Sequence, residues 1–163
     1  MRHAKTPTLP RLTRRRLLCA AAGLPLATLG RQATACEFFS PLLRIDHPWT
    51  RATAPGADHA VLIARFDDVM ETDRLIGIKA EWADGAVLVS ADGVGPLDLE
   101  IPKGETVALD EAGTHIRLVG LKAPLQFGRT YPMTMHFTRG GPTPVDLNVD
   151  YAQFSFSSRA LRR

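Results

Sequence analysis

The chain lacks most of the short motifs that identify enzymes and metal sites. Its 163 residues contain no segment of the form C-x-x-C, H-E-x-x-H, G-x-x-x-x-G-K-[S/T] or G-x-S-x-G. These absences exclude the commonest zinc, nucleotide-binding and hydrolase signatures. With only two cysteines, the chain is also not a small domain held together by disulfides.

Acidic residues are missing from residues 1–35, which carry seven of the 20 basic residues. The remaining chain has 13 basic and 17 acidic residues, a net charge of −4. The high isoelectric point, about 9.2, therefore comes from the N-terminal segment. Because a nucleic-acid-binding domain needs a basic surface on its folded part, we expect no nucleic-acid partner.

The first 35 residues have the pattern of a secretory signal peptide. Residues 1–16 are basic, residues 17–29 are mostly apolar, and Ala33 and Ala35 supply small residues for cleavage near Ala35. Thirteen helical residues rise about 20 Å, too little for a bilayer core of about 30 Å. We therefore expect export to the periplasm and no transmembrane segment in the mature chain.

The export route has two interpretations. Residues 13–18 read TRRRLL, which is similar to the twin-arginine export motif, and the Ala-rich apolar region and Arg31 fit that route. The alternative is the general route with an ordinary basic N-terminal region. Cleavage would leave Cys36 first, where bacterial lipoproteins carry their acylated cysteine. The Leu usual three residues earlier is replaced by Ala33, so a lipid anchor, a disulfide between chains and a thiol all stay open.

The mature chain is predicted to be all-β. About eight short apolar or alternating segments, bounded by Gly, Pro and Asp, recur at spacings near 8–12 residues, as in a sandwich or small barrel. No segment shows a sustained helical period. The predicted strands are residues 58–66, 73–78, 85–90, 97–101, 106–109, 115–119, 130–137 and 145–149.

This pattern divides the chain into four parts: a signal peptide at 1–35, an N-terminal extension at 36–43, a β domain at 44–150 and a tail at 151–163. The tail alternates briefly and could add one edge strand. Within the domain, alternation places Met133 and Met135 on the core side of their strand. The acidic pairs Asp67-Asp68 and Asp110-Glu111 are interpreted as solvated loops.

Five blocks of the domain resemble the periplasmic copper chaperone family called PCuAC. They read IDHPWTRATAPGA (45–57), DRLIG (73–77), EIPKGET (100–106), GTHIRLVGLKAPL (113–125) and RTYPMTMHF (129–137). The resemblance implies a cupredoxin-like Greek-key fold and no enzymatic activity. It also implies that the protein carries Cu(I) toward a copper-accepting protein or an oxidase assembly factor.

The resemblance also locates the copper ligands of the family, which are a His in a V-x-L-H strand, a later Met, and a His-x-Met pair. At these positions this chain has Ser90, a shortened segment without Met, His115 and Arg117. Thioether sulfur and imidazole suit Cu(I), so only His115 is kept as a metal residue. The sequence thus predicts a copper chaperone-like protein with a degenerate site.

Other readings of the same residues remain open. Met70 and Cys36 could join His115 in a different soft-metal site. Arg117 could bind an anion or simply face solvent, which would make the protein a non-metal binding or interaction module.

A distant third reading is a hydrolase in which Ser90 and His115 act with Asp92 or Asp98. The other histidines of the mature chain are expected to be packed or hydrogen-bonded, in the case of His47, and ordinary surface or strand residues, in the case of His59 and His136.

Overall fold

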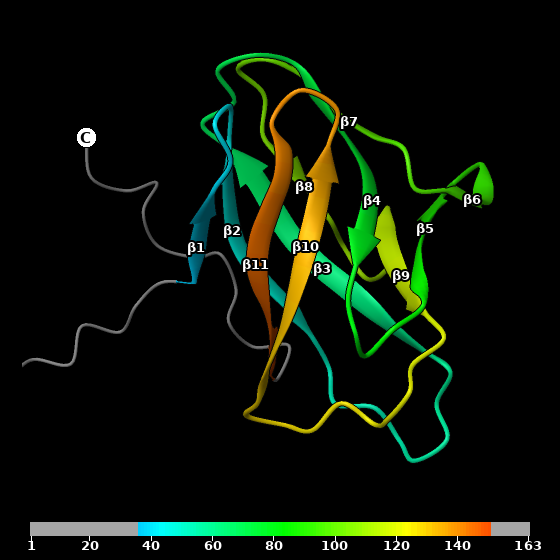
Figure 1. Cartoon of the computed structure of the whole chain (residues 1–163). Helices are drawn as coiled ribbons and strands as arrows, with labels where there is room; N and C mark the ends of the chain where they lie inside the picture. The colour runs from blue at the N-terminus through cyan, green and yellow to red at the C-terminus, as the bar shows by residue number, and fades with distance from the viewer. Residues whose placement is uncertain (1–35, 151–163) are drawn as a thin grey trace, which may run out of the picture. The chain divides into compact units, whose positions relative to one another are not determined.

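The computed structural model describes residues 36–150, and within them the regular elements are β strands (Figure 1). No helix in this part is long and apolar enough to cross a membrane. The strands are β1 (Glu37–Phe39), β2 (Arg44–Thr50), β3 (His59–Asp67), β4 (Asp73–Lys79), β5 (Gly85–Ser90), β6 (Gly93–Pro96), β7 (Leu99–Ile101), β8 (Val107–Ala108), β9 (His115–Val119), β10 (Thr130–Phe137) and β11 (Gly141–Val149).

The strands form one curled sheet in the order β6-β5-β9-β3-β2-β11-β10-β4-β7. Strand β3 joins its two halves: residues 59–62 pair with β9, while residues 65–66 pair with β8. Figure 1 shows β3 crossing behind β10 and β11, so that the sheet folds over itself. Strands β2 and β11 are parallel, and the other pairs are antiparallel. The predicted all-β sandwich or barrel is confirmed.

Residues 36–150 contain eleven strands where the sequence indicated about eight. The additional ones are β1, β2 and β6. In β2, His47 has a left-handed φ of 46° and is followed by Pro48, and the pairing with β3 shifts register between Asp46 and Trp49. A bulge of this kind hides the two-residue period. Strand β6 reads GVGP, a composition that ordinarily signals a turn.

The core is formed by the inward-facing residues of the strands, which alternate with outward-facing ones along several of them. Met133, Met135 and Phe137 are each at most 4% exposed, which confirms their predicted core position. Leu97, Leu99 and Ile101 are also buried on one side. Phe38 of β1 is partly buried and packs against this cluster.

Asp67 is a correction to the expected solvated loop at Asp67-Asp68. It is 4% exposed and closes β3, where Arg44 binds it through Nε at 2.7 Å and Nη2 at 2.9 Å. Arg65 adds a second ion pair at 2.8 Å. The hydrogen bond to Asp67 raises the pKa of Arg44 above its ordinary value. Burial of the carboxylate is tolerated because two guanidinium groups neutralise it.

A second buried carboxylate, Asp73, holds the turn between β10 and β11. It is 1% exposed, and its oxygens accept backbone N–H groups from Arg74, Arg139 and Gly140, each at 2.8 Å. This contact ties the start of β4 to the β10–β11 turn. The polar group is therefore buried with its hydrogen bonds satisfied.

Candidate functional site

His115 opens β9 and is 8% exposed. Its Nδ1 lies 3.0 Å from the carbonyl oxygen of Gly113. A carbonyl only accepts, so in the neutral ring Nδ1 carries the proton and Nε2 keeps the lone pair. A histidine fixed through one nitrogen in this way has the orientation common to metal-binding imidazoles.

Arg117 lies two residues further along β9, on the same side as His115. Ile116 and Leu118 point to the core and are 0% exposed. Cross-strand pairing places Val87 of β5 and Val61 of β3 opposite Arg117, and Val89 opposite His115. We call the surface formed by Val61, Val87, Val89, His115 and Arg117 the Arg117 face.

The guanidinium of Arg117 forms no hydrogen bond or ion pair within residues 36–150. Seven arginines lie within residues 36–150, and five of them pair with carboxylates. In the same range, the Nε of Arg117 is buried without a hydrogen-bond partner. The pKa of nearby Asp58 is lowered mainly by its hydrogen bond with His59, and the charge of Arg117 adds to the shift. Arg117 therefore places a cation two residues from His115 on the same side of β9.

The residues of the hydrolase interpretation do not assemble into a catalytic trio. The Oγ of Ser90 accepts the backbone N–H of Asp92 at 3.3 Å. The carboxylate of Asp98 is held by Arg74 at 2.7 and 2.6 Å. Across residues 36–150, the hydrogen bond of His115 goes to a backbone carbonyl, and none links it to a carboxylate. A nucleophile–base–orienter arrangement is thus missing from this part of the chain.

The second soft-metal arrangement is not brought together either. The carbonyl oxygen of Cys36 accepts the backbone N–H of His47, beside β1. Met70 is 58% exposed in the loop after β3, and its backbone N–H binds the carbonyl of Leu42. Figure 1 shows β1 and β9 on opposite sides of the view. Among the described residues, no three His, Cys, Asp or Glu side chains cluster closely enough to hold a metal.

The remaining histidines have structural neighbours. The ring of His47 stacks on Trp49 with centroids 6.4 Å apart. His59 is exposed, with Nδ1 2.6 Å from Asp58 Oδ1. His136 lies on the outer side of β10, opposite Pro142. These placements agree with the roles expected of them.

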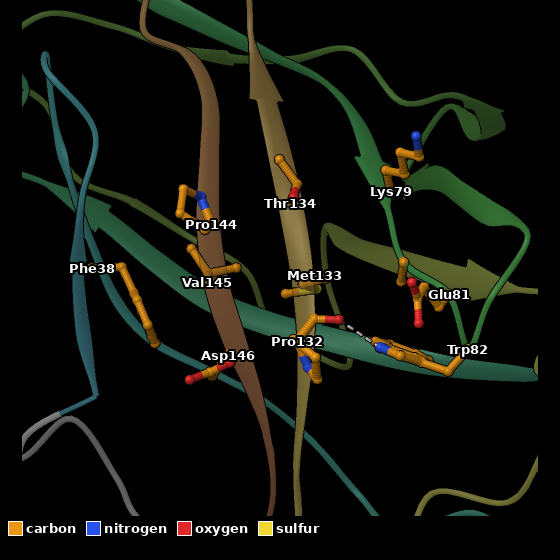
Figure 2. A pocket seen from close by; sticks show the side chains of 11 residues that line it. Phe38, Lys79, Glu81, Trp82, Pro132, Met133, Thr134, Pro144, Val145 and Asp146 are labelled. Atoms are coloured by element: carbon orange, nitrogen blue, oxygen red, sulfur yellow. Dashed lines mark hydrogen bonds between the residues drawn. The ribbon is translucent and has the colours of Figure 1, made fainter.

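A groove of about 1070 Å³ on the outer side of β10 and β11 was missed by the sequence reasoning. Figure 2 shows Phe38 on one side and Trp82 on the other, with Pro132, Thr134 and Pro144 between them. The indole Nε1 of Trp82 donates to the carbonyl of Pro132 at 2.8 Å, which fixes that wall of the groove. The sequence gives only a weak indication of this groove, which is the alternation of Pro and polar residues along β10 and β11.

Comparison with known proteins places the fold. A family described as "Putative lipoprotein LpqE-like" matches residues 43–149. The protein named "Putative lipoprotein Lxx21020", from Leifsonia xyli subsp. xyli (strain CTCB07), is 29% identical over 134 residues, covering 75% of this chain and 74% of that protein. The sequence match thus spans almost all of the described domain.

Three solved structures are also similar to this chain. The copper-bound PCuAC domain from PmoF2 is similar with a TM-score of 0.65 and 26% identity, over 70% of this chain and 97% of that domain. The apo PCuAC domain from PmoF1 has a TM-score of 0.64, 26% identity and coverages of 70% and 98%. The Cu(I)-bound solution structure of DR1885 from Deinococcus radiodurans, at 22% identity, covers 76% of this chain and 87% of that one, with a TM-score of 0.58. The predicted cupredoxin-like, PCuAC-like fold is confirmed.

Proposed function

The chain belongs to the LpqE-like family, and from this membership we propose that it is an exported, copper chaperone-like protein rather than an enzyme. The observation that carries the proposal is its likeness to a copper-bound PCuAC domain over nearly the whole of that domain. His115 supports it from within this chain. Its imidazole is held by Gly113, and its Nε2 keeps a lone pair of the kind that coordinates copper.

We further propose that the copper site is degenerate. Ser90 and Arg117 stand where the family has His and Met, and one imidazole does not hold Cu(I) selectively. A guanidinium about 4 Å from a cation costs about 4 kcal/mol at an effective dielectric near 20. Cu(I) would therefore be bound weakly by the isolated chain, and ligands from a copper-accepting protein or an oxidase assembly factor would complete its coordination.

The location of the protein is also a proposal. Residues 1–35 would direct export to the periplasm, with cleavage near Ala35. The lipoprotein names of the family and of the Leifsonia protein support a lipid anchor at Cys36. The mass of the protein purified from its native membrane distinguishes the alternatives, because an acylated Cys36 adds the mass of its lipid chains.

A second candidate function is a non-metal interaction module on the same scaffold. It is favoured by Arg117, which forms no ion pair within residues 36–150 and lies on a valine-lined face. The two functions differ in what the purified chain binds, so a metal titration separates them.

Titration with Cu(I) against a competing chromophoric chelator tests the copper proposal. We expect one weakly bound Cu(I) in the wild-type chain and a loss of about tenfold or more in His115→Ala, equivalent to about 1.4 kcal/mol. His59→Ala is the matched control, because that imidazole is exposed and hydrogen-bonded to Asp58. If His115→Ala bound copper as the wild type does, or if binding never exceeded the chelator background, the interaction module would be favoured.

A further inference from the structure

We propose that the Arg117 face is a docking site for a carboxylate side chain presented by a partner protein. Such docking is separate from copper handling, because it needs no metal and depends on the guanidinium of Arg117 and the valines around it.

The first support is the unmet hydrogen-bonding capacity of Arg117. Buried donors in folded proteins nearly always have a partner, yet within residues 36–150 its buried Nε has none. The nearby carboxylate of Asp58 feels the charge of Arg117, but its hydrogen bond goes to His59 at 2.6 Å. Because the Nε is enclosed, a carboxylate from outside would bind the terminal Nη1 and Nη2 atoms of this partly exposed side chain, which form no hydrogen bond or ion pair with residues 36–150.

The surroundings of Arg117 give the second support. Val61 and Val87 lie directly across from it on the flanking strands, and both are partly exposed. A partner covering these valines would exclude water from the guanidinium. Charge-assisted hydrogen bonds to a planar carboxylate are strong and two-pronged for Arg, and they strengthen when water is excluded. Arginine at the centre of an apolar surface is a common anchor of protein interfaces.

The shape of the site selects a protein side chain over a small metabolite. The Arg117 face is the outer side of three adjacent strands, β3, β9 and β5. Small ligands favour concave sites that enclose most of their surface, whereas a sheet face suits a protein surface. A second copy of this chain is disfavoured as the occupant if it used the same face, because two guanidinium groups would meet. The occupant is therefore a different protein that presents Asp or Glu among apolar residues.

Two short peptides test the proposal: acetyl-Val-Glu-Val-amide and acetyl-Val-Gln-Val-amide. They are titrated into the isotope-labelled chain in metal-free buffer, and amide chemical shifts are followed by NMR. We expect saturable shifts at residues 61, 87 and 117 with the Glu peptide, and about tenfold weaker binding of the Gln peptide. Because metal is absent, a negative copper titration leaves this result unaffected.

Matched variants assign the binding to Arg117. Arg117→Gln is expected to weaken the Glu peptide about tenfold or more, and Arg117→Lys, which keeps the charge but loses the planar fork, is expected to be intermediate. Arg129→Gln is the control, since Arg129 is exposed and no carboxylate within residues 36–150 forms an ion pair with it. If Arg117→Gln does not fold, Arg117→Lys alone decides. Equal affinity for the two peptides, no saturation by about 10 mM, or a variant at 117 that binds like the wild type would each overturn the proposal.

Discussion

Asp67 and Asp68 are the same residue type, side by side in the chain, yet one is 4% exposed and the side chain of the other is 73% exposed. Nothing local in the sequence separates them. The difference arises from the strand register, which sets Arg44 opposite Asp67 across β2 and β3. Long-range pairing of this kind decides which charges are buried, and this is why the sequence alone led to the wrong prediction at Asp67.

Asp73 allows a direct test at the residue scale. Asp73→Ala removes the acceptor of three backbone N–H groups, one in β4 and two at the β10–β11 turn. Leaving buried donors unsatisfied is expected to lower the free energy of unfolding by about 3 kcal/mol. Urea denaturation measures the change. The exposed Asp92 is the control, where Asp92→Ala should change stability by no more than about 0.5 kcal/mol.

At the level of single strands, agreement with the predicted bounds does not follow alternation alone, since the alternating segment 97–101 forms a strand only at Leu99–Ile101. Strands β5, β9 and β10 have the predicted bounds. Strand β2 was not predicted, because Pro48 and the bulge at His47 interrupt its period. Strand β6 was not predicted, because two of its four residues are glycines and one is a proline. It is a strand only because it pairs with β5. Tertiary pairing therefore supplies what local pattern lacks.

The β10–β11 turn gives a prediction at this scale. A Cβ at Gly140 would lie 2.4 Å from the Oγ of Ser40 and 3.1 Å from Oδ2 of Asp73, so Gly140→Ala is expected to destabilise by about 2 kcal/mol. Gly95→Ala is the steric control, because a Cβ there meets nothing within 4 Å. Thermal or urea unfolding reports both. Similar stabilities for the two variants would show that the turn is not packed as described.

For the molecule as a whole, the resemblance assigns a site to His115 and Arg117, whereas the groove was not predicted. The resemblance alone placed His115 and Arg117, and the structure sets them on one side of β9. The groove is formed by β1, by the segment after β4 and by the β10–β11 hairpin. These three parts are far apart in the chain. Apart from the weak alternation of Pro and polar residues along β10 and β11, no local motif indicates the groove. Phe38 and Trp82 lie on opposite sides of the same groove because the curled sheet brings them together (Figure 2).

Stability of the whole molecule should depend on pH through its ion pairs. The hydrogen bond from Arg74 lowers the pKa of Asp98 below its ordinary 3.8. A lowered folded-state pKa gives stability that is complete above the unfolded value and is lost as the pH falls through the folded value. We therefore expect the free energy of unfolding to decline below about pH 4. In Asp98→Asn this decline should be smaller, and equal pH profiles in urea denaturation would contradict it.

We propose that this chain keeps the PCuAC-like fold but has a cation, Arg117, where a copper-binding thioether would stand. Arg117→Met tests it most directly, because the substitution removes the positive charge beside His115 and supplies the missing sulfur. Measured by Cu(I) competition, the variant should bind at least about tenfold more tightly than the wild type, while Arg129→Met should not differ from it. Tight Cu(I) binding by the wild-type chain, unchanged in Arg117→Met, would contradict the account.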